Sequence, residues 1–89
     1  MDQLEREVFE FPTSIPLKVI GRNEDDFERH VLELFRVHVA EADIYEVVSR
    51  LSKGDTYLSV TVAFLAQSRE HLDAIYSELG QSKRVMMVI

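Results

Sequence analysis

The chain has 89 residues, of which 46% are hydrophobic and 29% are charged, and its formal net charge is −6. This length and composition fit one folded domain and exclude an intrinsically disordered chain. The acidic balance disfavours nucleic acids and anionic membrane surfaces as partners, and the absence of cysteine excludes disulfides and thiolate metal sites.

The opening residues are acidic and carry no apolar segment, so they do not form a signal peptide pattern. No apolar run approaches the roughly 18 residues that a membrane-spanning helix needs. We therefore expect a cytoplasmic protein without membrane partners. Residues 1–11 are predicted to be a flexible lead-in, with Phe9 or Phe11 packing onto the body, and residues 12–89 to be a single domain.

The first half of the domain reads as a strand followed by a helix. Pro12 and Pro16 restrict the chain to extended geometry and introduce a strand over 15–21. Asn23 is the predicted N-cap, because acidic residues follow it and complement the positive end of a helix dipole. The helix is predicted to run to about Val39. The residues that share its apolar face are Phe27, Val31, Leu34, Phe35 and His38.

The second half begins with a hairpin. A weakly patterned strand over 44–52 and a turn over 53–55 lead into residues 55–66, which alternate apolar and polar side chains with a period of two. This regular alternation predicts a central strand with one buried face. The side chains predicted to be buried are Leu58, Val60, Val62 and Phe64.

A second helix and a last strand complete the chain. Ser68 is the predicted N-cap, and Gly80 is the predicted left-handed residue that ends the helix. Its apolar face comprises Leu72, Ile75, Tyr76 and Leu79. Residues 83–89 form an apolar run that is too short for a helix after a glycine, so we predict a strand.

The element order is therefore β-α-β-β-α-β. Right-handed crossovers place both helices on one face of a four-stranded antiparallel sheet. The predicted fold is α+β and ferredoxin-like, with strand order 4-1-3-2, so that the second and fourth strands are edges.

No pattern for catalysis or for a metal site stands out, and we expect neither a cofactor nor a metal. His38 lies in the apolar stripe of the first helix and is predicted to be a partly buried histidine bonded to a neighbour. His30 and His38 are too far apart along a helix to share a zinc ion, whereas His30 and His71 lie on different helices and are able to approach each other. The serines on the strands have no histidine nearby in the sequence, which argues against nucleophilic catalysis.

Two surfaces are candidate binding sites. The exposed face of the sheet carries Tyr57, Ser59 and Thr61, together with either Lys18 and Ile20 or Leu17 and Val19 from the first strand. It lacks the stacked aromatic and basic residues of RNA-binding sheets, so a small apolar ligand or a protein partner is the better interpretation. The last strand is the second candidate, because an apolar edge without charge is either a pairing site or a covered core strand. Its residues are Val85, Met86, Met87 and Val88.

Several short sequence motifs, spread over nearly the whole chain from Phe11 to Ile89, together resemble those of the YbeD-like family of small uncharacterised bacterial proteins. They lie in the segments 11–12, 16–21, 26–31, 36–39, 57–62, 72–79 and 85–88. The resemblance implies a ferredoxin-like fold similar to the ACT regulatory domains, and a non-catalytic regulatory role with a small acyl ligand such as lipoic acid, or an amino acid.

The resemblance to ACT domains also implies a ligand region at the turn between the first strand and the first helix, at Gly21, Arg22 and Asn23. A partner subunit often completes that region, so a homodimer is one expectation. A glycine-containing loop before a helix also resembles the anion-binding loop of acylphosphatases, which have this fold. The three acidic residues that follow Asn23 would repel an anion, so a loop with a helix cap is the better interpretation.

Overall fold

Four strands and two helices follow one another in the predicted order, with a short 3-10 helix between the first helix and the second strand. The computed structural model describes residues 10–89. The elements are β1 (Thr13–Arg22), α2 (Phe27–Arg36), η1 (Glu41–Asp43), β2 (Ile44–Leu51), β3 (Tyr57–Ala66), α3 (Arg69–Gly80) and β4 (Val85–Val88).

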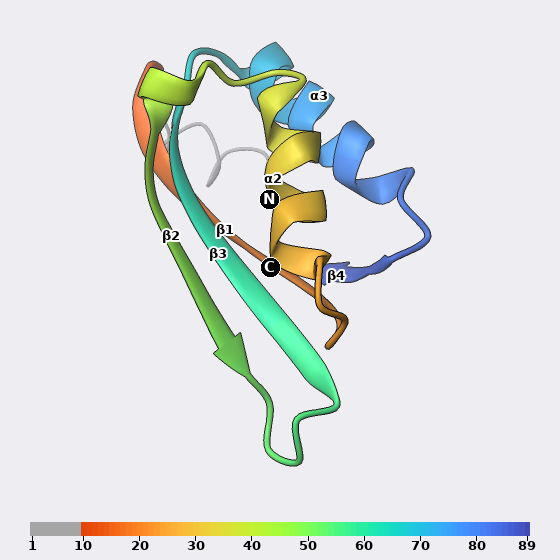
Figure 1. The fold of residues 1–89 in the computed structure, drawn as a ribbon. Coiled ribbons are helices and arrows are strands. Elements are labelled where there is room, and N and C mark those ends of the chain that lie inside the picture. The colour runs from red at the N-terminus through yellow and green to blue at the C-terminus, as the bar shows by residue number, and fades with distance from the viewer. Residues whose placement is uncertain (1–9) are drawn as a thin grey trace.

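The sheet is antiparallel throughout, with the strand order β2-β3-β1-β4. This is the predicted order read from the opposite edge, so the ferredoxin-like prediction is confirmed. Both helices lie on one side of the sheet, and the loop that joins β2 to β3 extends beyond them (Figure 1). The other side of the sheet carries neither helix, as the crossover argument requires.

The core lies between the sheet and the helices. The rings of Phe35 and Phe64 meet edge to face with their centroids 5.2 Å apart, and each large side chain buried there contributes about 1.5–3 kcal/mol. Tyr76 was predicted to belong to this core, but it is 43% exposed and lies beside the face of α3 that packs on the sheet. The buried hydrophobic residues are Ile15, Leu17, Val19, Phe27, Val31, Phe35, Val39, Val60, Val62, Phe64, Ala66, Leu72, Ile75 and Leu79.

Helix α2 is shorter at both ends than predicted. Asn23 does not cap it: its side-chain amide donates a hydrogen bond to the carbonyl oxygen of Asp55 at 3.0 Å. The helix begins at Phe27, and Asp26, which precedes it, makes no side-chain capping bond. The helix ends at Arg36 rather than Val39, so the predicted continuous stripe ends one turn early.

Helix α3 begins as predicted and ends differently. The hydroxyl oxygen of Ser68 accepts a hydrogen bond from the backbone N–H of His71 at 3.0 Å, which confirms the N-cap. Gly80 is a helical residue and does not adopt the predicted left-handed conformation. The helix instead closes through Gln81, whose N–H donates to the carbonyl of Ser77 at 3.1 Å, so no left-handed residue is needed.

The hairpin loop is one residue longer than predicted, because Ser52 and Tyr57 are the last pair: the N–H of Ser52 donates to the carbonyl of Tyr57 at 2.9 Å. The central strand therefore starts at Tyr57 rather than Asp55. Gly54 and Asp55 have φ angles of 86° and 61°, in the left-handed region that glycine occupies freely and aspartate tolerates.

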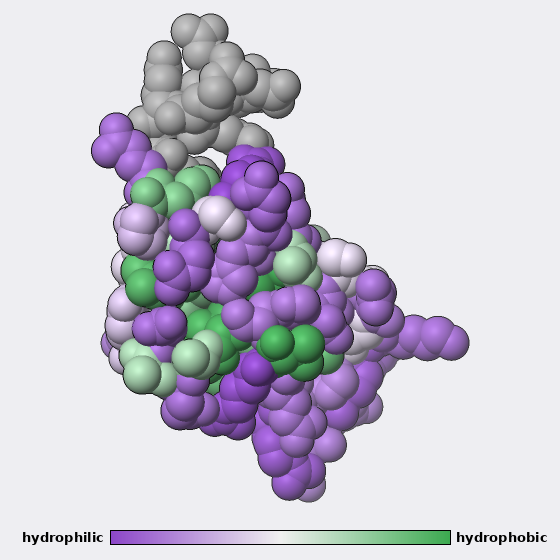
Figure 2. Space-filling view, turned by 90° about the horizontal axis from the view of Figure 1, so that it is seen from above, coloured by the Kyte–Doolittle hydropathy of each residue, from purple (hydrophilic) through white to green (hydrophobic). Residues whose placement is uncertain are grey.

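Phe11 is half-buried and packs against the core, as predicted for one of the two phenylalanines of the lead-in. Phe9 lies outside the described residues, and the flexibility of residues 1–11 stays a prediction. Seen from the end opposite the hairpin loop, the surface is mainly hydrophilic, with apolar patches between the polar side chains (Figure 2). Among residues 10–89, no helix is long and apolar enough to cross a membrane.

Candidate functional site

The side of the sheet that carries no helix is here called the open face. Alternation along β1 places Lys18 and Ile20 on it, while Leu17 and Val19 are buried under the helices, which settles the alternative that the sequence left open. The register pairs Ile20 with Ser59, so both strands contribute to one surface. The predicted residues Tyr57, Ser59 and Thr61 all lie on the open face.

Strand β2 adds two residues that sequence reasoning missed. Arg50 pairs with Ser59, and Val48 pairs with Thr61, so both lie on the open face. The hydroxyl of Ser59 donates to the carbonyl oxygen of Arg50 at 3.3 Å. A hairpin loop one residue shorter, as predicted, would have turned Arg50 to the helix side, because a shift of one residue exchanges the faces of a strand.

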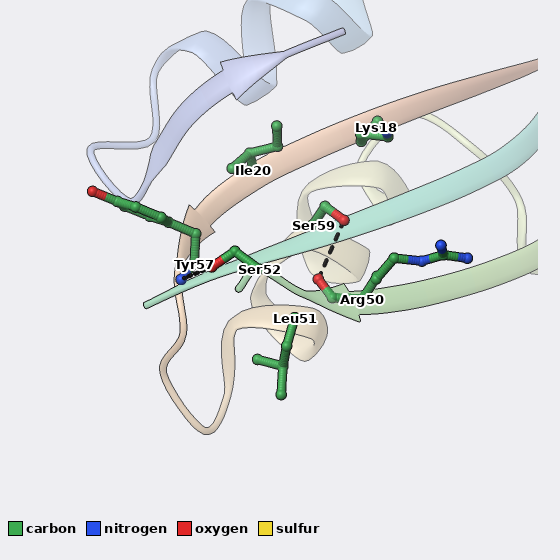
Figure 3. Close-up of a pocket in the computed structure, with 7 residues that line it drawn as sticks. All are labelled: Lys18, Ile20, Arg50, Leu51, Ser52, Tyr57 and Ser59. Atoms are coloured by element: carbon green, nitrogen blue, oxygen red, sulfur yellow. Dashed lines mark hydrogen bonds between the residues drawn. The ribbon is translucent and has the colours of Figure 1, made fainter. Parts of the chain in front are cut away.

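Two hollows of about 230 Å³ and 260 Å³ adjoin on the open face and share Lys18, Arg50 and Ser59. Figure 3 shows the first: Ser59 lies between β1 and β2, and Tyr57 extends away from it at one end, while Leu51 points to the other side of the sheet. The other lining residues are Ile20 and Ser52 in the first hollow and Val48 and Thr61 in the second.

The cations of the open face lack acidic partners. Within residues 10–89, Lys18, Arg22 and Arg50 make no ion pair, although the chain as a whole is acidic. The arginines on the helix side are all paired: Arg29 with Asp26 at 3.7 Å, Arg36 with Glu41 at 2.7 Å, Arg69 with Asp73 at 3.2 Å and Arg84 with Asp26 at 2.7 Å. Unpaired cations beside apolar side chains are suited to an anion that also carries apolar surface.

The turn that the resemblance pointed to is only partly accessible. Gly21 faces the ring of Phe27, and a Cβ on it would lie 2.6 Å from the carbonyl oxygen of Arg84. The side chain of Asn23 is engaged with the hairpin loop. Of the three predicted residues, Arg22 alone lines a hollow, which has a volume of about 280 Å³. Glu24, Lys83, Arg84 and Met86 complete that hollow.

An ion cluster below this turn ties β4 to the start of α2. The guanidinium of Arg84 lies 2.7 Å from a carboxylate oxygen of Asp26 and 3.0 Å from one of Glu24, and 5.8 Å from the centroid of the Phe27 ring. The hydrogen bond from Arg84 lowers the pKa of Asp26 below its ordinary value of 3.8, and the same bond raises the pKa of Arg84. Asp26 is thus committed to Arg84, which explains why it does not cap α2.

The side chains of the predicted interface strand β4 differ in their exposure. Val85 and Val88 are half-buried and pack against the core. Met86 and Met87 are 56% and 54% exposed. A role for Val85, Met86, Met87 and Val88 in binding a partner stays a prediction.

The histidines are bonded to separate partners. His38 Nε2 lies 3.0 Å from a carboxylate oxygen of Glu78, which confirms the predicted partly buried histidine with a bonded neighbour. His71 Nε2 lies 2.7 Å from the carbonyl oxygen of His38, and His30 Nε2 lies 2.8 Å from the hydroxyl of Ser82. The expected approach of His30 to His71 is not supported by these bonds. Among the described residues, no group of three or more histidine, cysteine or acidic residues is placed to hold a metal ion.

Solved structures with the same arrangement of elements identify the class of fold. The solution structure of protein HP0495 from H. pylori matches with a TM-score of 0.72 and 16% identity, covering 92% of this chain and 86% of that chain. The ACT domain of GTP pyrophosphokinase from Chlorobium tepidum matches with a TM-score of 0.69 and 10% identity, covering 88% and 96%. The fold is therefore ferredoxin-like, an arrangement that this ACT domain shares.

A family model described as "Protein of unknown function (DUF493)" matches residues 6–89. The UPF0250 protein of Chromobacterium violaceum is 38% identical over 89 residues, which cover 100% of both chains. The chain belongs to this DUF493/UPF0250 family of bacterial proteins, and the resemblance seen in the sequence is confirmed.

Proposed function

We propose that the protein is a non-catalytic regulatory module that binds a small carboxylic acid with an apolar chain on its open face. The observation that carries this proposal is the pair Lys18 and Arg50, two cations without an acidic partner within residues 10–89, at two adjoining hollows. The ACT-like fold and the resemblance of the sequence, which implies an acyl ligand such as lipoic acid, support the same proposal.

The chemistry of the hollows matches both halves of such a ligand. The planar guanidinium of Arg50 is able to hold a carboxylate through two parallel hydrogen bonds, and the ammonium of Lys18 adds a second positive charge. Ile20, Val48 and Tyr57 offer apolar surface beside these cations for an acyl chain. A charged carboxylate with a short hydrocarbon body therefore fits better than a sugar or a nucleotide.

The non-catalytic part of the proposal rests on the residues around the hollows. The described residues that line them include no histidine, aspartate or glutamate to act as a general acid or base. Their serine hydroxyls are already engaged: Ser59 donates to the carbonyl of Arg50, and Ser52 accepts from the N–H of Tyr57 at 2.9 Å. Both hydroxyls are bonded to backbone groups rather than to a side chain that acts as a base, which an activated nucleophile requires.

Thermal unfolding in the presence of lipoate, octanoate and the uncharged octanamide tests the proposal. A ligand at 100 times its dissociation constant adds about 2.7 kcal/mol to stability, which for a domain of this size raises Tm by about 10–20 °C. We expect this rise with the two carboxylates and a much smaller one with the amide.

Variants locate the effect on the open face. Lys18→Gln and Arg50→Gln are each expected to abolish the rise, whereas Arg29→Gln, which removes a helix-side arginine, leaves it intact. Binding to the open face is refuted if no carboxylate stabilises the protein at millimolar concentration, or if the Arg50→Gln variant responds like the wild type.

A further inference from the structure

Strand β2 forms an edge of the sheet that is long, exposed and only lightly protected. It has eight residues, compared with four in β4, and it lies at the outer side of the sheet (Figure 1). Three of its apolar side chains are open to solvent: Tyr45 is 54% exposed, Val48 42% and Leu51 48%. Edge strands usually avoid pairing through short length, charged side chains, proline or β-bulges. Strand β2 has no proline, and its two charges, Glu46 and Arg50, are of opposite sign. Its register shift lies near its start, between Ile44 and Glu46, so residues 46–51 pair regularly with β3.

The backbone groups that β2 directs to solvent can be assigned from its pairing with β3. The N–H of Ser52 donates to β3, and the carbonyl of Arg50 accepts from the hydroxyl of Ser59, so even-numbered residues point their polar groups inward. Hydrogen-bonded pairs alternate along an antiparallel ladder. The N–H and C=O groups of Val47, Ser49 and Leu51 therefore point outward and are free to accept another strand.

We infer that these groups pair with the same edge of a second copy of this chain, antiparallel and across a two-fold axis at Val48. Outward-pointing residues must lie opposite one another, which leaves five registers, centred on the residues from Val47 to Leu51. The register centred on Val48 places Glu46 opposite Arg50 of the second copy, and Arg50 opposite Glu46 of the second copy.

This register makes the strand complementary to itself. The two Val48 side chains meet at the axis, and the opposite charges form two equivalent ion pairs on the open face, where Arg50 otherwise has no acidic partner among the described residues. Registers centred on Val47 or Ser49 place a charge opposite Val48, and a register centred on Arg50 places the two arginines opposite each other. None of these registers, nor the one centred on Leu51, forms the ion pairs.

The consequence is a closed dimer with an eight-stranded sheet. An isologous contact of this kind uses the same patch on both copies and does not propagate into a fibre. Both open faces lie on the same side of the joined sheet, because the pairing preserves the pleat. Glu46 and Arg50, which would resist pairing with an unrelated strand, specify the correct partner.

Charge-swap variants test the dimer by sedimentation over a concentration series at low salt. We expect the wild type to dimerise, and Glu46→Arg and Arg50→Glu each to weaken the dimer at least tenfold, because each turns both ion pairs into repulsions. The double variant E46R/R50E restores the dimer. An equimolar mixture of the two single variants forms heterodimers, since each supplies the charges that the other lacks.

Control variants distinguish pairing through β2 from association through another surface and from loss of folding. Arg22→Glu reverses a charge on the open face away from β2 and is expected to leave the dimer unchanged, and circular dichroism checks that every variant is folded. Val48→Lys, which places two like charges at the axis, serves as a second disrupting variant. A wild type that stays monomeric at every concentration, or a dimer that survives both single swaps, overturns the inference; a monomer that pairs with a different protein through β2 does so too.

Discussion

The substitution Gly21→Ala probes the tightest place in the fold. Gly21 lies in β1 where the strand passes beneath the start of α2, and an added Cβ would overlap the ring of Phe27 and lie 2.6 Å from the carbonyl oxygen of Arg84. Neither neighbour moves easily. Phe27 is fully buried in the core, and Arg84 is held by Asp26.

The expected cost follows from forcing a methyl group into this filled space. Overpacking a core costs about 1–3 kcal/mol, and the contact with backbone places Gly21→Ala at the upper end. For a domain of this size, a loss of about 2–3 kcal/mol lowers Tm by roughly 8–24 °C. Urea unfolding followed by circular dichroism measures the same change as a lower midpoint at constant slope.

Gly80→Ala is the matched control, because it makes the same chemical change where nothing lies within 4 Å. Gly80 is helical, so alanine is expected to stabilise the domain by about 0.5–1 kcal/mol. Gly54, with its φ of 86°, is an intermediate case, since alanine there costs about 1–2 kcal/mol of backbone strain. A Gly21→Ala variant as stable as the wild type would refute the close packing of β1 under α2. A destabilised Gly80→Ala variant would instead support the left-handed conformation of Gly80 that the sequence predicted.

Three further outcomes are expected. Val60→Asp places a charge at a fully buried position of β3 and should cost at least 3 kcal/mol in urea unfolding, whereas Ser59→Asp, on the open face beside Arg50, should cost less than about 1 kcal/mol. The pKa of Asp26 is lowered in the folded state, so its contribution to stability is present above its ordinary pKa of 3.8 and is lost as the pH falls further; Asp26→Asn should therefore flatten the pH dependence of Tm below about pH 4. A carboxylate ligand and the second copy compete for the guanidinium of Arg50, so saturating octanoate should weaken the dimer, and dilution should tighten octanoate binding in titration calorimetry; because the dimer has two such sites, its dissociation constant should rise by the square of the change in octanoate affinity.

The elements with strong local patterns were predictable. The alternation of β3 fixed which of its faces is buried, since Val60, Val62 and Phe64 are fully buried. The order of elements then determined the sheet topology, because crossover handedness leaves few alternatives. The capping serine Ser68 was also predictable, since it interacts with a residue only three positions away.

What the sequence did not reveal depends on partners far away in the chain. Asn23 and Asp26 both have the chemistry of a helix cap, but Asn23 bonds to the hairpin loop and Asp26 bonds to Arg84, more than thirty residues away in either case. Nothing local shows which of these long-range bonds will form. The position of Arg50 was unpredictable for a similar reason. A change of one residue in the length of the hairpin loop would move its side chain to the other face of the sheet.

The two sides of the sheet differ in whether their basic side chains form ion pairs. On the helix side, every arginine of the described chain is paired, and the cluster around Arg84 joins β4 to α2, so these charges serve stability. On the open face, Lys18 and Arg50 add nothing to the core and have no acidic partner within residues 10–89, although acidic residues outnumber basic ones in the chain. Unpaired cations in such a position are better explained by binding to a partner from outside the chain than by a role in folding. Arg50 is placed to meet two such partners, a carboxylate ligand and Glu46 of a second copy.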